Sequence, residues 1–187
     1  MQAIDLLHNR VSTPALMEPA PSAEQLEVMF QAAARAPDHA NLRPWRMIVT
    51  QGEGLVKMGE LFLEATHKLD PAQAEAKEAR LLNMPLRAPM IITVVASIVE
   101  HPKVPELEQL ITAGCAAHAM ELAAYAQGLG AMWRSGDLMF DANVKAGLGL
   151  SESEQIVGFL YLGTPKTVRQ ACAVDSTEFV SHWPAAL

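Results

Sequence analysis

One long apolar stretch limits the possible folds of this chain more than any other feature. Residues 105–127 contain no proline after Pro105, and Gly128 ends the run, which predicts a helix about 35 Å long. Its second half, ITAGCAAHAMELAAYA, is apolar nearly all round and rich in small residues. We therefore expect it to be enclosed and to approach a second helix closely, as at a subunit interface. In such a helix, His118 is expected to be a core histidine rather than a ligand.

Shorter patterns along the chain alternate between helix and strand. The run MIITVVA at 90–96 is unbroken and apolar, so we expect a central strand buried on both faces. Further strands are predicted at 46–50, 131–134 and 156–162, and helices at 2–10, 22–34, 58–65, 70–82 and 141–148. Ser22, Asp70 and Asp141 are expected to cap the helices that follow them, and the charged 70–82 helix to be a solvated cover. Four strands with helices between them predict an α/β layered domain.

Length and charge restrict the class of protein further. Residues 1–187 are expected to form one domain, with residues 164–187 as a tail that lies on another surface, because this tail has little periodic apolar surface. The net charge of −7, from 14 basic and 21 acidic residues, argues against nucleic acid and anionic membranes as partners. No signal-peptide pattern, disulfide framework or metal-ligand spacing is recognised, so we expect a cytoplasmic protein without a metal site.

Two non-periodic stretches carry the candidate chemistry. The loop RAPDHANLRPW, residues 35–45, is unusually rich in charged and aromatic side chains and is predicted to be a binding loop. The alternative is a surface turn whose tryptophan packs on the core. The second stretch, WRSG at 133–136, ends a predicted strand, and we expect both stretches to meet over one flat anionic ligand. Gly128-x-Gly130 is not read as a dinucleotide fingerprint, because it follows a helix and precedes a strand.

The order of these motifs resembles the nitroreductase family of flavoproteins. The motifs are Arg10-x-Ser12, the 35–45 loop, the long small-residue helix and WRSG. The match is closest to the small single-domain subgroup of YdjA-like NAD(P)H nitroreductases. The resemblance implies a three-layer α-β-α sandwich around a mixed, mainly antiparallel sheet, with the C-terminal tail exchanged in a homodimer. It also implies two FMN molecules at the subunit interface and electron transfer from NAD(P)H, as co-substrate, to a small-molecule acceptor such as a nitroaromatic or a quinone.

The same resemblance assigns roles to individual residues. Those implied to bind the cofactor are Arg10, Val11, Ser12, Arg35, His39, Trp133, Arg134, Ser135 and Gly136. Arg10 and Ser12 would hold the FMN phosphate, and Val11 is a departure, since related sequences often carry a second basic residue there. Arg35 and His39 would reach the flavin from the opposite subunit. Lys166 and Arg169 are further candidates for phosphate contacts.

The 133–136 stretch would lie along the flavin edge. A backbone N–H of Ser135 or Gly136 would donate to the ring nitrogen that accepts hydride, and Arg134 would stabilise negative charge on the reduced ring. Plain core packing is the alternative for Trp133. No residue of the set is a catalytic acid, base or nucleophile, because the flavin carries the chemistry. The expected kinetics are ping-pong, and the alternatives are a flavin protein that stores, senses or consumes FMN and an α/β binding module without flavin.

Overall fold

A five-stranded sheet runs through the middle of the molecule in the computed structural model, which describes residues 2–183. The strands are β1 (Leu16–Met17), β2 (Trp45–Gln51), β3 (Met90–Ser97), β4 (Gly130–Arg134) and β5 (Glu154–Pro165). Their order is β1-β5-β3-β2, and β4 pairs with β5. Each of these pairings is antiparallel, so the described sheet is antiparallel throughout. The prediction that the 90–96 run is a central buried strand is confirmed, because every one of these residues in β3 is buried.

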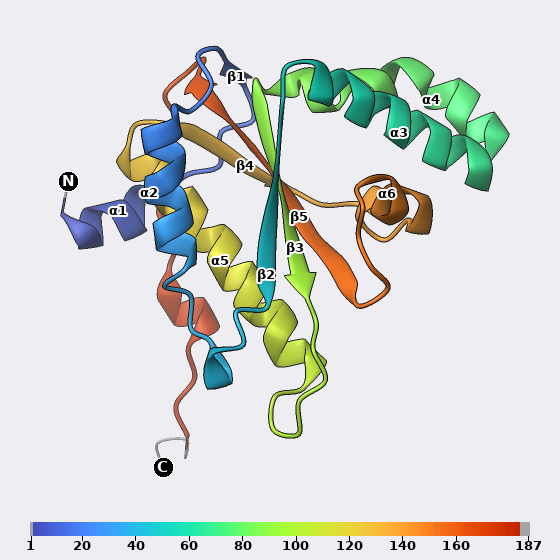
Figure 1. Ribbon diagram of the computed structural model, residues 1–187. Coiled ribbons are helices and arrows are strands. Elements are labelled where there is room, and N and C mark those ends of the chain that lie inside the picture. Colours follow the sequence, from blue (N-terminus) through green and yellow to red (C-terminus); the bar gives the residue numbers. More distant parts are fainter. Residues whose placement is uncertain (1, 184–187) are drawn as a thin grey trace.

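Helices cover both faces of this sheet (Figure 1). They are α1 (Ala3–Asn9), α2 (Ala23–Ala33), α3 (Glu53–Leu69), α4 (Pro71–Asn83), α5 (Glu106–Ala126) and α6 (Ala142–Gly147), with short 3-10 turns at His39–Asn41, Pro85–Arg87, Asp137–Met139 and Ser176–Phe179. Ile92 and Leu160 point to the core shared with α2 and α5, whereas Ile91 and Tyr161 point to the core shared with α3, α4 and α6. This alternation produces the expected three-layer α-β-α arrangement.

The predicted helix starts are confirmed in detail. Ser22 accepts a hydrogen bond from the backbone N–H of Gln25 at 3.3 Å, and the Gln25 side chain accepts from the Ser22 N–H at 2.9 Å. The Asp70 side chain caps α4 by accepting a hydrogen bond from the backbone N–H of Gln73 at 2.9 Å, with Pro71 in the first turn of the helix. Asp141 accepts from two backbone N–H groups of α6. The local chemistry of these residues therefore determines where the helices begin.

The structure extends the predicted sheet at several points. The two-residue strand β1 was not predicted, β2 begins at Trp45, and β5 runs from Glu154 to Pro165 rather than from 156 to 162. Two residues are too few to show a periodic pattern, and β1 exists because Leu16 and Met17 pair with the end of β5. Tertiary pairing, rather than local pattern, therefore defines these segments.

The helix α5 is enclosed on one side only. Ala113, Ala116 and Met120 are fully buried against the sheet, but Leu107 and Ile111 are 66% and 57% exposed. The prediction of a core histidine is wrong, because the side chain of His118 is 52% exposed. A sequence pattern that is apolar all round does not reveal which face of a helix meets the rest of its own chain.

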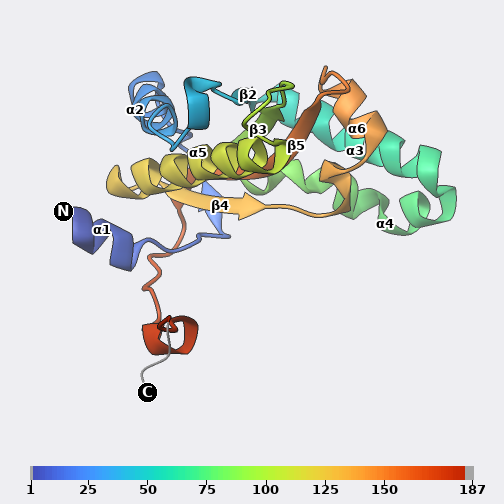
Figure 2. The same cartoon turned by 90° about the horizontal axis from the view of Figure 1, so that it is seen from below.

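The C-terminal tail leaves the body of the molecule (Figure 2). From residue 166 to 183 almost every residue is exposed, and Trp183, Val168 and Phe179 are 96%, 94% and 75% exposed. Backbone contact with the body continues as far as Lys166, whose N–H donates to the carbonyl of Ala15 at 3.0 Å. Within residues 2–183, no helix is long and apolar enough to cross a membrane.

Candidate functional site

The segment after α1 is fixed against the edge of β4. Arg10 follows the last residue of α1, and its backbone N–H donates to the carbonyl of Leu6. Three residues later, the N–H of Thr13 donates to the carbonyl of Ala131 in β4 at 2.8 Å. The side chain of Arg169 reaches the same segment from the tail, because its Nη1 donates to the carbonyl of Ser12 at 3.0 Å. Two arginines that are far apart in sequence therefore flank Ser12.

Arg10 carries unused hydrogen-bonding capacity. Within residues 2–183, its guanidinium makes no hydrogen bond, and its one ion-pair contact is with Glu121 of α5, at 4.0 Å between Nη1 and Oε1. The side chain of Arg10 is 26% exposed. Val11 and Ser12 are half-buried beside it. A permanently charged guanidinium with free donors at a partly exposed position is suited to a phosphate or carboxylate.

Trp133 and Arg134 lie on opposite faces of the sheet. Trp133 packs into the core under α5, so closely that a Cβ on Gly158 of β5 would lie 2.0 Å from its Nε1. The guanidinium of Arg134 stands over the ring of Tyr161, 5.1 Å from the ring centre, on the other face. The side chains of Trp133 and Arg134 therefore lie on different faces, because successive residues of a strand point to opposite sides. That the 133–136 stretch lies along the flavin edge stays a prediction.

On the face of the sheet that carries Arg134, a buried tyrosine lies next to charged arginine side chains. Burial raises the pKa of Tyr161, while Arg134 and Arg87 act in the opposite direction. The Nε of Arg134 is buried and has no hydrogen-bond partner within residues 2–183. After Arg134 the chain leaves the sheet at Ser135 and Gly136, which are exposed. Gly136 has a φ of 136°, a conformation open to glycine and strained for other residues, which turns the backbone sharply at the end of β4.

His39 lies at the N-terminal end of α5, whereas Arg35 lies beside a cavity lined by α5 residues from Ile111 to Leu122. Nδ1 of His39 is 2.8 Å from Oε2 of Glu108, in the first turn of α5. Asp38 shapes the loop by accepting N–H bonds from Leu42 and Arg43 at 3.2 and 2.7 Å. Residues 35–44 form a partly exposed connection with one 3-10 turn, and Trp45 is the first residue of β2, so that this stretch is a binding loop stays a prediction.

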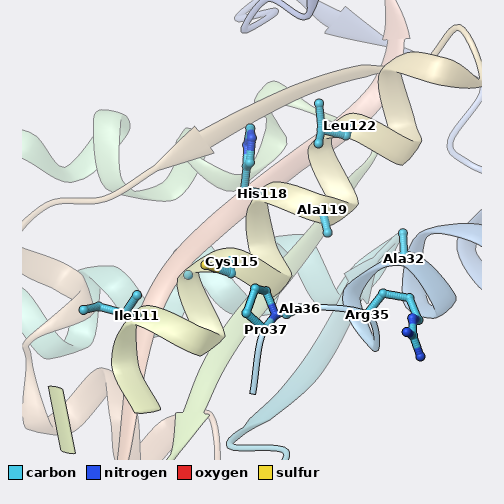
Figure 3. Close-up of a pocket in the computed structure, with 10 residues that line it drawn as sticks. Ala32, Arg35, Ala36, Pro37, Ile111, Cys115, His118, Ala119 and Leu122 are labelled. Carbon is cyan, nitrogen blue, oxygen red and sulfur yellow. The ribbon is translucent and has the colours of Figure 1, made fainter. Parts of the chain in front are cut away.

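A shallow apolar cavity of about 450 Å³ separates this loop from α5 (Figure 3). It is lined by Ala32, Arg35, Ala36, Pro37, Ile111, Gly114, Cys115, His118, Ala119 and Leu122. In Figure 3 the side chain of Arg35 points away from α5, and Pro37 faces it. The cavity therefore has an apolar floor of small side chains and a charged group at its rim.

One chain does not bring the two groups of predicted residues together. His39 meets α5 at Glu108 and Arg10 meets it at Glu121, 13 positions further along (121 minus 108). At 1.5 Å per residue these contact points are about 20 Å apart. Arg10 and Ser12, which lie beside β4 at Ala131, form one group, and His39 belongs to another at the N-terminal end of α5.

Two residues that contact the Arg10–Ser12 segment were not assigned to it from the sequence. Glu121 was missed, although it is the sole Asp, Glu, Lys or Arg between Ile111 and Ala126. It is 5% exposed. Arg169 was named as a candidate without a contact, and its bond to Ser12 now places it at the segment. An isolated charge in an apolar helix is the sequence signal that could have identified Glu121.

Solved structures of other proteins share this fold. A nitroreductase-like family protein from Bacillus cereus matches with a TM-score of 0.82 at 23% identity, over 99% of this chain and 97% of the other. A nitroreductase with bound FMN from Bacteroides fragilis matches with a TM-score of 0.73 at 21% identity, over 94% and 96% of the two chains. The architecture is therefore that of the nitroreductase fold.

The sequence itself defines the family. The profile of the Nitroreductase family matches residues 7–164. An Escherichia coli K12 protein named "Putative NAD(P)H nitroreductase YdjA" is 44% identical over 185 residues, which cover 98% of this chain and 100% of that protein. The chain therefore belongs to the nitroreductase family of oxidoreductases, as its motifs predicted.

Proposed function

We propose that this chain is an FMN-dependent oxidoreductase that passes electrons from NAD(P)H to a nitroaromatic, a quinone or a similar organic acceptor. Family membership supports the reaction class, and the name of the Escherichia coli relative supports NAD(P)H as the electron donor. The FMN bound to the related Bacteroides fragilis structure supports the choice of flavin. When bound, FMN accepts hydride from the nicotinamide and delivers electrons to the acceptor.

The observation that carries the proposal is the pair of arginines around Ser12. Within residues 2–183 the guanidinium donors of Arg10 make no hydrogen bond, and Arg169 is hydrogen-bonded to the carbonyl of Ser12, so two positive charges lie beside one short backbone segment. Such a donor set fits a phosphate monoester, which carries close to two negative charges at neutral pH. Ser12 adds a hydroxyl that can donate to phosphate or ribityl oxygens. In a chain with a net charge of −7, this local positive group is the natural anion site.

The end of β4 supplies the other half of the site. We assign the backbone N–H groups of Ser135 or Gly136 to the hydride-accepting edge of the flavin, because both residues are exposed where β4 ends. Arg134, fixed over Tyr161, contributes positive potential from the same strand. We assign Trp133 a packing role, since its ring lies between α5 and Gly158 and is partly buried against the core.

We further propose that each site is completed by a second copy of the chain. The separation of about 20 Å along α5 keeps His39 away from Arg10 in one chain. The exposed apolar side chains of Leu107 and Ile111, and the exposed tail, offer the surface that an isologous dimer would bury. Arg35 and His39 of one chain would then reach the flavin of the other. Of the expected 164–187 tail, the part beyond the contact of Arg169 with its own Ser12 would lie on the partner, and residues 184–187 lie outside the described residues.

Purification and kinetics test the function. The protein should be yellow and release FMN on denaturation, which a binding module without flavin would not do. It should oxidise NADH or NADPH with a quinone or nitroaromatic acceptor, whereas a storage protein would not turn over. Double-reciprocal plots at several acceptor concentrations should be parallel, because donor and acceptor use the same flavin face in turn. Intersecting lines would contradict the ping-pong mechanism.

Truncation tests the shared site. A chain ending at Pro165 retains the full length of β5 and loses the tail together with Arg169. We expect joint loss of dimer mass in light scattering and of bound FMN, because a ligand that binds only the assembled state is linked to assembly. The full-length Arg169→Ala variant is the control: it removes the cation but leaves the tail. A truncated monomer with full flavin occupancy would refute the shared site.

A further inference from the structure

Glu121 is a buried carboxylate to which the proposed mechanism gives no role. It is 5% exposed, and its Oε1 accepts no hydrogen bond from any residue between 2 and 183. Two side-chain nitrogens approach it: Nη1 of Arg10 lies 4.0 Å from Oε1, and Nδ1 of His118 lies 3.9 Å from Oε2. Neither contact is short enough to be a hydrogen bond. A buried carboxylate that lacks hydrogen bonds is destabilising unless a nearby charge compensates for it.

Arg10 is the stronger of the two partners. The side chain of His118 is 52% exposed, so water screens its contact, whereas the side chain of Arg10 is 26% exposed and is always charged. Arg10 in turn has little else to hold it, because α1 contains no buried residue and packs on α5. The carboxylate of Glu121 is therefore the feature of α5 that orients the arginine.

The 4.0 Å separation has a chemical consequence. The attraction between the two charges acts at this distance without using any N–H of the guanidinium as a hydrogen-bond donor. Within residues 2–183, all five donors of Arg10 remain available. An arginine held by charge alone is fixed in place and still able to make a bidentate contact with a second anion.

We infer that Glu121 is a positioning residue that holds the guanidinium of Arg10 against α5, with its donors free for the phosphate of FMN. This inference rests on the proposed function and adds Glu121 to the site as a residue that acts, through Arg10, on the phosphate of FMN. Glu121 should affect recognition of the phosphate and leave recognition of the ring and the ribityl chain unchanged. Riboflavin, which lacks the phosphate, separates these two effects.

The experiment measures the preference for FMN over riboflavin, defined as the ratio of the riboflavin Kd to the FMN Kd. Riboflavin is titrated against the FMN-loaded protein, and bound flavin is separated and quantified. Glu121→Gln keeps the side-chain volume and removes the charge, and we expect it to lower the preference about tenfold, the low end for loss of a charge-assisted contact. Glu121→Asp keeps the charge and should retain more of the preference than Glu121→Gln. In an Arg10→Ala background, Glu121→Gln should produce no further change.

Glu154→Gln is the matched control, because it also neutralises a buried carboxylate paired with an arginine, but on β5 beside Arg46. It should leave the preference unchanged. An unchanged preference in Glu121→Gln would overturn the inference, and so would equal losses of FMN and riboflavin affinity, which would mark a direct ribityl contact or a purely structural role. Wild-type protein that binds neither flavin would instead overturn the proposed function itself, before any variant is compared.

Discussion

Replacing Glu154 by Gln should destabilise the fold in a pH-dependent way. The carboxylate of Glu154, on β5, forms a bidentate ion pair with Arg46 of β2. Nε of Arg46 donates to Oε1, and Nη2 donates to Oε2. Ser97 of β3 donates its hydroxyl to Oε1 at 3.0 Å, and the N–H of Ser151 donates to Oε2 at 2.9 Å. One carboxylate thus joins three strands and the loop that precedes β5.

The magnitude follows from the pKa of this carboxyl. The hydrogen bonds from Arg46, opposed by burial and aided by Ser151 and Ser97, lower the pKa of Glu154 from 4.5 to about 2. At about 1.4 kcal/mol per pH unit, this difference corresponds to roughly 3 kcal/mol of stability at neutral pH. The Arg46 side chain is 39% exposed, so solvent screening reduces the expected loss in Glu154→Gln to about 2 kcal/mol.

The sign of the pH dependence is fixed by the direction of the pKa change. A lowered folded-state pKa means that the contribution is fully present above pH 4.5 and is lost as the pH falls toward 2. Urea unfolding of FMN-loaded protein at fixed concentration should therefore show a free-energy difference of about 2 kcal/mol between wild type and Glu154→Gln at pH 7, shrinking below pH 4.5.

Glu152→Gln is the control for this experiment, because Glu152 is exposed, two positions before Glu154. Its free energy of unfolding should stay within about 0.5 kcal/mol of wild type at every pH. A Glu154→Gln difference that persists unchanged down to pH 3 would refute the reasoning, since it would show that packing, rather than the ionised carboxylate, stabilises this corner.

Three further predictions concern the site and its scaffold. Arg10→Ala should weaken FMN binding about ten- to a hundred-fold in a fluorescence titration, since a charge-assisted phosphate contact contributes roughly 1.5–3 kcal/mol, while Val11→Arg should change the Kd much less. Gly158→Ala should displace the ring of Trp133, whose Nε1 would lie 2.0 Å from the new Cβ, and shift tryptophan fluorescence; an unshifted spectrum would contradict this packing. Gly59→Ala should lower the free energy of unfolding by about 1–3 kcal/mol, because its Cβ would lie 2.4 Å from a carbonyl oxygen of α4. An unchanged free energy of unfolding in urea would show that α3 and α4 can move apart without loss of stability.

The amino-acid sequence by itself determined the local features of the fold. Ser22, Asp70 and Asp141 fix helix starts through bonds to neighbouring backbone groups, which depend on residues two or three positions away. The unbroken apolar run in β3 predicted a buried central strand, because a strand without polar residues is stable only where both of its faces are covered. The order of the motifs also predicted the family, which the comparisons confirm. The assignment of individual residues to FMN remains a prediction.

Only the tertiary structure decided which residues face one another. Strand β4 sends Trp133 to α5 and Arg134 to Tyr161, although the two are adjacent in sequence. The pairing of β1 and the exposure of His118 likewise depend on segments far away along the chain. Periodicity reports that a side chain needs an apolar or polar environment, but not which distant element provides it. Contacts between distant elements are therefore fixed by how the whole chain packs, and the sites that depend on them become visible only in the folded structure.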